Sequence, residues 1–165
     1  MLTWTTYGTW LQGDRRRWVK DGAIHEANPA LENINRQNMK AKHVMLSKEQ
    51  KIYAASAIID KASELKQKVF ALTVCSNHIH ILLQNIDLSI GRVVSHYKHA
   101  IRLALQQQGF QGKLWTRGFD KRYCMDNQDI STKIAYIRTH ENTDAEILVS
   151  PQIYSAGLEI NENEK

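Results

Sequence analysis

The feature that most constrains the fold is a short apolar run, Asn77–Leu83, that contains two histidines, His78 and His80. Its β-branched residues favour an extended strand. In a strand the side chains of residues i and i+2 point to the same face, so both imidazoles would stand side by side while Ile79 and Ile81 face the other way. Such a pair is either half of a divalent-metal site, which needs further ligands, or a hydrogen-bonded pair at a strand edge.

Charge is unevenly distributed along the 165 residues, whose net charge is +5. Residues 1–140 hold 21 bases and 11 acids, a net +10, whereas residues 141–165 hold six acids and one base. A basic body suits nucleic acid, because neutralised phosphates release their counterions, although a solvated basic surface has the same composition. The pattern predicts one domain over residues 1–142 and an acidic C-terminal tail over residues 143–165.

The sequence gives no sign of a membrane or of an oxidising environment. No apolar run approaches the ~20 residues that a spanning helix needs, and the opening Met1–Trp4 lacks the basic lead of a secretory signal. Cys75 and Cys124 are far apart and have no CxxC spacing, as expected for bystander thiols. We therefore expect a cytoplasmic protein with no membrane partner.

Strand and helix patterns alternate along the rest of the chain. A capping box of Ser47 and Gln50 opens one helix, and residues 20–46 lack a period and are expected to form a long excursion with one short helix. The order predicts an α+β fold, an antiparallel sheet with helices packed on one face. The other expected elements are strands over 3–11, 69–74 and 78–84, a helix from Ser89 to just before Gly109, a strand or hairpin over 113–124, a helix over 129–140 and an edge strand at 147–149.

The last expected helix carries a second group of chemical interest. Ile130, Ile134 and Ile137 form its apolar stripe, and Tyr136 and His140 lie on its flank, one turn apart. A hydroxyl and an imidazole that project together from this flank could meet the histidine pair of the central strand. The alternative is a surface tyrosine that packs at the helix edge.

Tyr97 is the rival candidate for a catalytic tyrosine. It lies on the preceding helix and shares the inner stripe of Val93, Val94 and Ile101, so core packing is the favoured interpretation. Lys98 lies on the flank of the same helix, where its charge could contact phosphate.

The chain resembles the HUH endonucleases and, within them, the single-tyrosine transposases of bacterial insertion sequences, a group that includes the REP-associated tyrosine transposases. The resemblance runs over roughly residues 2–142. Its carriers are the segments Trp4–Leu11, Gly13–Asp14, Ser76–His80, Trp115–Gly118 and Ile134–Ile137.

The resemblance implies a ferredoxin-like fold with the histidine pair on a central strand. It also implies that His78 and His80 bind Mg²⁺ or Mn²⁺ and that Tyr136 is the nucleophile. Related enzymes often complete the metal site with Gln or Asn four positions after the tyrosine, where this chain has His140. A nitrogen-rich ligand set favours Mn²⁺ or another transition metal over Mg²⁺.

The implied activity is the cutting and rejoining of single-stranded or hairpin DNA through a 5′-phosphotyrosine intermediate. A homodimer is compatible with the family, and the sequence leaves open whether the tyrosine serves its own site or a partner's. Three arginines interleaved with a tryptophan are the best signal for DNA contact. The candidate DNA-binding residues are Arg15, Arg16, Arg17, Trp18, Lys20, Lys98, Trp115, Arg117, Lys121 and Arg122.

Three other functions compete with this one. A histidine-triad hydrolase requires a third histidine where the chain has Leu82. A relaxase is longer and usually takes a third histidine from elsewhere in its chain. A domesticated DNA-hairpin-binding protein could keep the same fold without cleaving, but the retention of His78, His80 and Tyr136 together argues against it.

Overall fold

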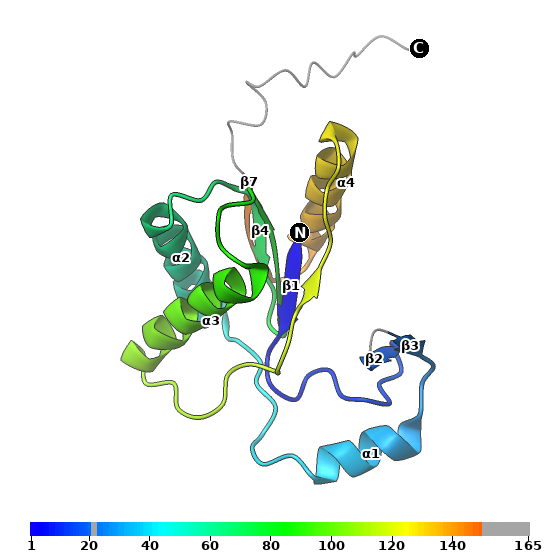
Figure 1. Ribbon diagram of the computed structural model, residues 1–165. Helices are drawn as coiled ribbons and strands as arrows, with labels where there is room; N and C mark the ends of the chain where they lie inside the picture. The colour runs from blue at the N-terminus through cyan, green and yellow to red at the C-terminus, as the bar shows by residue number, and fades with distance from the viewer. Residues whose placement is uncertain (21–22, 150–165) are drawn as a thin grey trace.

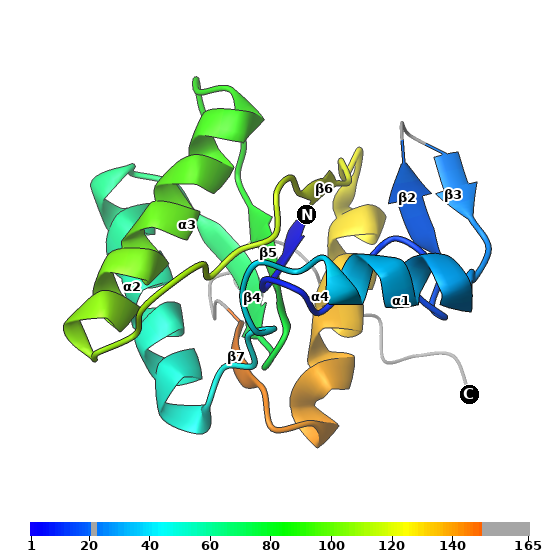
Figure 2. The same cartoon turned by 90° about the horizontal axis from the view of Figure 1, so that it is seen from below.

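The computed structural model describes residues 1–20 and 23–149 (Figure 1). Its centre is an antiparallel sheet of five strands in the order β6-β1-β5-β4-β7. A separate ribbon of two strands, β2 and β3, lies away from this sheet (Figure 1 and Figure 2). The strands are β1 (Leu2–Thr5), β2 (Trp18–Lys20), β3 (Ala23–His25), β4 (Val69–Val74), β5 (His78–Leu83), β6 (Asp120–Lys121) and β7 (Glu146–Val149).

Helices lie in the connections from β3 to β4, from β5 to β6 and from β6 to β7. Within the part of the chain that the structure describes, they are α1 (Pro29–Gln37), α2 (Lys48–Glu64), α3 (Ile90–Gln107), α4 (Asn127–Arg138) and the 3₁₀ helix η1 (Thr139–Asn142). The succession β1-α2-β4-β5-α3-β6, with the spatial order β6-β1-β5-β4, is the ferredoxin-like arrangement of a split βαβ pair. The predicted α+β class with an antiparallel sheet is therefore confirmed.

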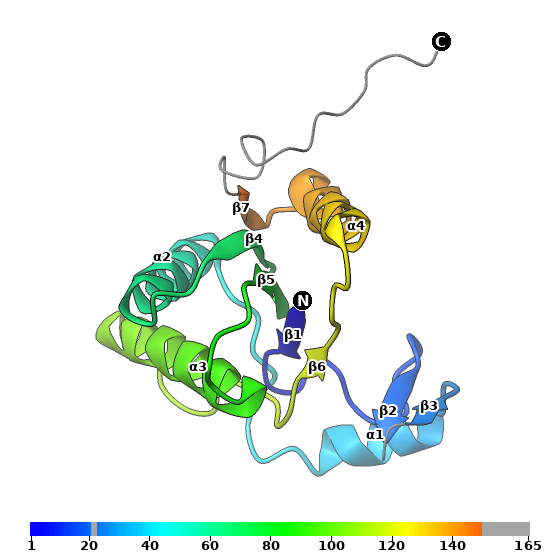
Figure 3. The same ribbon diagram turned by 45° about the horizontal axis from the view of Figure 1, so that its top comes forward.

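The central strands bury side chains on both faces of the sheet. Ile79 and Ile81 of β5 pack in the larger core with residues of α2 and α3. Leu82 points the other way, into a smaller core with Ile134 and Ile137 of α4. Figure 3 shows α2 and α3 on one side of the sheet and α4 on the other.

The expectation that the helices share one face therefore needs a correction. It holds for α2 and α3, whereas α4 covers the opposite face. The physical reason is that Ala71 and Leu82 give this second face an apolar area of its own, which the isoleucine stripe of α4 buries.

Local capping explains where the helices begin. The predicted capping box of Ser47 and Gln50 opens α2, with both of its hydrogen bonds formed. Asp126 caps α4 by accepting a hydrogen bond from the backbone N–H of Asp129, so this helix starts earlier than expected. It also ends earlier, at Arg138, and His140 lies in the 3₁₀ turn that follows.

The first expected strand is shorter in the structure than in the sequence prediction. β1 ends at Thr5, and Gly8 has φ +74°, a left-handed conformation that interrupts an extended strand. The expected excursion over 20–46 contains α1 and part of the β2–β3 ribbon. Within residues 1–20 and 23–149, no helix is long and apolar enough to cross a membrane.

The chain after residue 142 returns to the sheet before it leaves the described residues. β7 pairs antiparallel with β4 as an edge strand, as predicted for residues 147–149. Asp144 forms an ion pair of 2.8 Å with Lys51 of α2, and the side chain of Lys51 is only 2% exposed. The first residues of the expected acidic tail therefore contact the folded body, and residues 150–165 lie outside the described residues.

The Lys51–Asp144 ion pair gives a test of this contact. Asp144→Asn should lower Tm, because it leaves a buried ammonium without its anion. Adding Lys51→Met should recover much of the loss, since an apolar side chain needs no partner there. The matched control is Asp120→Asn, whose partner Arg122 is 64% exposed, and thermal unfolding should barely change. Equal shifts in Asp144→Asn and Asp120→Asn would contradict a supporting role for this pair.

Candidate active site

The two histidines of β5 share one face of the sheet. Their ring centroids are 4.7 Å apart, on the face opposite Ile79 and Ile81. In the neighbouring strand β1, Thr5 lies beside His78 and Thr3 beside His80 in register. The side-by-side placement of the imidazoles that the strand periodicity predicts is therefore what the fold produces.

The helix α4 and the turn after it bring two more rings to the pair. The centroid of His140 lies 5.5 Å from that of His78 and 5.3 Å from that of His80. The ring centroid of Tyr136 lies 5.3 Å from that of His80 and 5.5 Å from that of His140, and Tyr136 is 46% exposed. Three imidazoles and one accessible phenol thus converge from two distant segments of the chain.

Hydrogen bonds orient two of the imidazoles by their Nδ1 atoms. His78 Nδ1 is 2.6 Å from Asn77 Oδ1, and His140 Nδ1 is 3.2 Å from the carbonyl oxygen of Ile137. Because an amide or carbonyl oxygen only accepts, both Nδ1 atoms donate. The Nε2 atom of each ring then carries the free lone pair, which is the arrangement found in metal-ligating histidines.

His80 is held in a comparable way and is more deeply buried. Its Nδ1 lies 2.7 Å from the hydroxyl of Thr3, whose oxygen can accept a hydrogen bond from Nδ1–H and so leave the lone pair of Nε2 free. Burial, reinforced by the neighbouring imidazoles, lowers the pKa of His80 to about 3. Burial also lowers the pKa of His78 to about 4, with smaller contributions from His140 and Arg16. Both rings are therefore neutral at pH 7 and able to bind a cation.

Cys75 is a residue of this site that the sequence reasoning treated as a bystander. Its side chain is buried directly after β4, and one ligand atom each from Cys75, His78 and His140 lie within 4.8 Å of one another. Burial raises the pKa of its thiol. The available signal was strand alternation, which places Cys75 on the same face as Thr73, the residue paired with His80.

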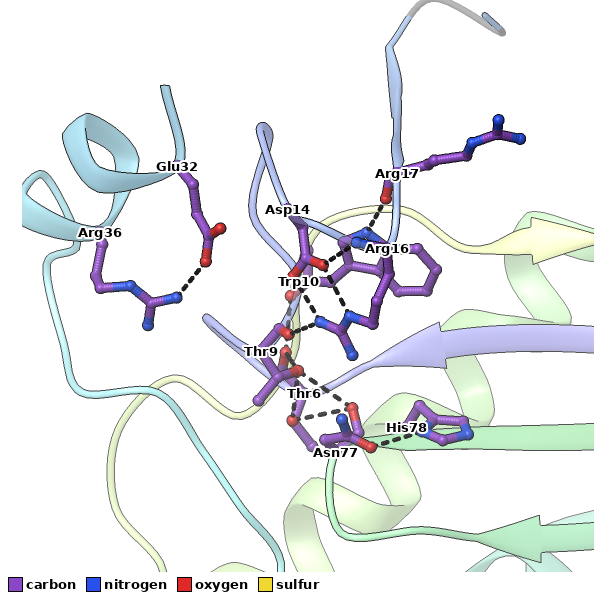
Figure 4. A network of polar contacts seen from close by, with 11 residues as sticks. Thr6, Thr9, Trp10, Asp14, Arg16, Arg17, Glu32, Arg36, Asn77 and His78 are labelled. Carbon is purple, nitrogen blue, oxygen red and sulfur yellow. Dashed lines mark hydrogen bonds and ion pairs between the residues drawn. The ribbon is translucent and has the colours of Figure 1, made fainter. Parts of the chain in front are cut away.

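Arg16 is fixed beside His78 by a network of polar contacts (Figure 4). Its guanidinium donates to both carboxylate oxygens of Asp14, at 2.8 and 2.6 Å, and to the carbonyl oxygen of Thr9 at 2.7 Å. It also lies over the ring of Trp10, 5.1 Å from the centroid. The pKa of Asp14 is lowered by this partner. The arginine is thus held in place by side chains and backbone of its own loop.

The same loop is tied to the turn that precedes β5. The hydroxyls of Thr6 and Thr9 donate to the carbonyl oxygen of Asn77, at 3.1 and 3.2 Å (Figure 4). Gly13 has φ +96°, and an added Cβ there would lie 2.4 Å from the backbone at Asn28 and Glu32. Only glycine therefore lets this loop pack against the start of α1.

The other predicted DNA-binding residues of this region differ in how far their side chains already contact other residues. Arg15 is exposed and lines a polar pocket with Arg36 and Asn77. Arg17 forms an ion pair of 2.8 Å with Glu26. The ring of Trp18 stacks on His25, at 4.3 Å between centroids, so one of its faces is already covered. Lys20 is exposed at the end of β2.

The second group of predicted DNA-binding residues lies around β6. Lys98 donates to the carbonyl oxygens of Thr116, at 3.1 Å, and Gly118, at 2.6 Å, and burial lowers its pKa to about 8. It therefore supports the loop on which Arg117 is exposed. Trp115 packs edge-on against Trp4 rather than standing free. Lys121 is exposed, and Arg122 is exposed with an ion pair of 3.1 Å to Asp120.

Tyr97 is excluded as an accessible nucleophile. It is fully buried in the core on the α2–α3 side, its hydroxyl donates to Gln67 at 2.8 Å, and burial raises its pKa to about 12. The interpretation of Tyr97 as a core residue is confirmed.

Comparison with known proteins gives one informative match. The family model described as "Transposase IS200 like" matches residues 37–140, a span that contains His78, His80, Tyr136 and His140. No curated protein matches the chain. The matched span covers more than half of the sequence and contains both the strand histidines and the helix tyrosine. The chain therefore belongs to the IS200-like transposases, a family of HUH single-tyrosine proteins that bind and cleave DNA with a divalent metal ion.

Proposed function

We propose that this chain cuts and rejoins single-stranded DNA, with Tyr136 as the nucleophile and His78, His80 and His140 as the metal ligands. The observation that carries the proposal is the convergence of the Tyr136 and His140 rings on the histidine pair, at 5.3 Å from His80 in both cases. The geometry offers one accessible phenol beside three oriented imidazoles, which supports the nucleophile that the family resemblance implies.

The donor chemistry of the site fits a divalent cation. Neutral imidazoles with their Nδ1 atoms already engaged present Nε2 lone pairs, and the low pKa values of His78 and His80 keep protons from competing for them. A bound ion would withdraw charge from the scissile phosphate and orient it. A set of three nitrogens favours Mn²⁺ over Mg²⁺, although the family's chemistry accommodates both.

Tyr136 supplies the covalent step. Its oxygen attacks phosphorus in line, a new O–P bond forms as the bond to the 3′ oxygen breaks, and that oxygen leaves as a 3′-hydroxyl after taking up a proton. The phenol gives its own proton to solvent, which its exposure permits. The product is a 5′-phosphotyrosine, and attack by another 3′-hydroxyl reverses the step to rejoin the strand without hydrolysis.

The described residues of one chain bring Tyr136 to the histidine pair. The isoleucine stripe of α4 packs on the sheet that carries the histidines, so Tyr136 lies beside His80 of the same molecule. We therefore propose that the tyrosine acts in cis. A homodimer of two such sites is compatible with this arrangement but is not needed to complete either one.

Exposed cations on two loops that adjoin β1 suggest the path of the DNA. Arg15, beside the Asn77 turn, and Arg117, on the loop that Lys98 supports, are exposed and lie on segments next to β1. Arg16, Arg17 and Arg122 already pair with carboxylates, and we expect them to position loops as well as phosphates. Lys121 extends the basic surface along β6.

Tyr136→Phe removes the nucleophilic oxygen and should abolish the covalent adduct on a single-stranded hairpin DNA while leaving DNA affinity within about twofold. The measurement is a denaturing gel of end-labelled DNA with Mn²⁺, followed by mass analysis of the labelled peptide. Tyr53→Phe is the matched control, because Tyr53 is also exposed but lies on α2, on the other side of the sheet. An adduct that persists in Tyr136→Phe would place the nucleophile elsewhere. Tight binding without an adduct in the unmodified chain would favour the non-cleaving hairpin-binding protein.

Replacing a proposed metal ligand should reduce cleavage because it weakens the binding of the metal ion. His78→Ala and His80→Ala should each reduce Mn²⁺-dependent adduct formation by about 100-fold or more, and His140→Ala should weaken Mn²⁺ affinity by about 10- to 100-fold. Calorimetric titration with Mn²⁺ and the adduct assay are the two readouts. His96→Ala, exposed on α3, serves as the control. Unchanged Mn²⁺ affinity in all three ligand variants would reject the metal site.

The proposed DNA path makes a prediction about salt. Arg15→Ala and Arg117→Ala should each weaken binding of every hairpin sequence alike and lower the slope of log Kd against log salt by about 0.7 per lost phosphate contact. Fluorescence anisotropy at several salt concentrations measures the slope. Arg92→Ala, an exposed arginine on α3, should leave it unchanged. A slope unaltered in Arg15→Ala and Arg117→Ala would take these residues off the DNA path.

A further inference from the structure

Cys75 lies at the histidine cluster but has no part in the proposed reaction. The residue is 7% exposed, and its Sγ lies 3.8 Å from the hydroxyl of Thr73. One donor atom each from Cys75, His78 and His140 are mutually within 4.8 Å. Among residues 1–20 and 23–149, no other group of three histidine, cysteine or acidic side chains gathers its donor atoms in this way.

The donor set determines which ions such a cluster prefers. A thiolate with two imidazoles and an open fourth position is a ligand set of tetrahedral Zn²⁺, while hard ions such as Mg²⁺ avoid thiolates. Tetrahedral bonds of about 2.0–2.3 Å place neighbouring donors roughly 3.3–3.6 Å apart. Donors now within 4.8 Å of one another would therefore close on an ion by about 1 Å, a movement within reach of side-chain rotation.

We propose that Cys75, His78 and His140 form a Zn²⁺ site, and that Zn²⁺ held there blocks strand transfer. Binding breaks the S–H bond of Cys75, whose proton passes to the buffer, and forms an S–Zn bond.

Inhibition follows from shared ligands. An ion bound to Cys75 uses His78 and His140, two of the three histidines that the catalytic ion would need, so the two ions exclude each other. The inhibitory part rests on the proposed function, whereas the binding part rests only on the cluster. The two parts can therefore be tested separately.

The binding test uses Co²⁺ as a visible substitute for Zn²⁺. The unmodified chain should show the visible bands of tetrahedral Co²⁺ together with a thiolate-to-cobalt band in the near ultraviolet, and Zn²⁺ should displace both. Cys75→Ser and Cys75→Ala should lose the thiolate band and raise the Kd for Zn²⁺ by about tenfold or more. Cys124→Ser, at the only other cysteine of the chain, should keep both properties. Circular dichroism establishes that each variant is folded, and the pair of Cys75 variants guards against the failure of one.

A thiolate band that is absent from the unmodified chain, or that survives in the folded Cys75 variants, would overturn the proposal. The inhibition test adds Zn²⁺ to the Mn²⁺-dependent adduct assay, where adduct formation should fall as Zn²⁺ passes its measured Kd. Cleavage supported by Zn²⁺ would refute the inhibitory part. An adduct on Tyr136 without a thiolate band would contradict the zinc site but not the proposed function. A thiolate band without any adduct would contradict the proposed function but not the zinc site.

Discussion

The packing of α4 against the second face of the sheet is the contact on which the site depends. Ile134 and Ile137 of the helix bury themselves against Ala71 and Leu82 of the two central strands. Ala71 is fully buried and has a small side chain, which allows the helix to approach the sheet closely. The same approach carries the flank of the helix to the histidine side of β5. Without this apolar contact, the two histidines of β5 would have neither Tyr136 nor His140 beside them.

Desolvation then decides the chemical state of the histidine pair. His78 and His80 sit beneath α4 and η1, and their burial lowers both pKa values to about 4 and about 3. A solvated histidine would be partly protonated near pH 6, and a protonated ring repels cations. Burial therefore costs folding free energy at low pH, when the unfolded chain binds protons that the folded chain excludes. In return it keeps both imidazoles neutral over the whole physiological pH range.

The surroundings of the pair are arranged by hydrogen bonds from the first strand and its loop. Thr3 holds the ring of His80, and Thr6 and Thr9 hold the turn at Asn77, whose side chain in turn holds His78. The threonines that orient the two imidazoles, directly or through Asn77, thus come from a segment far from them in sequence. This explains why the opening strand and the histidine motif, which together suggested the family, are structurally one unit.

The sequence by itself determined the features that depend on local periodicity. Strand alternation put His78 and His80 on one face, and the helical stripe put Tyr97 in the core and Tyr136 on a flank. Only the tertiary structure decided which face α4 covers, because an isoleucine stripe fits any apolar surface. It also placed Cys75 beside His78 and His140 and bound Lys98 to backbone carbonyls. These contacts join residues distant in the chain, and local pattern carries no information about how such segments pack.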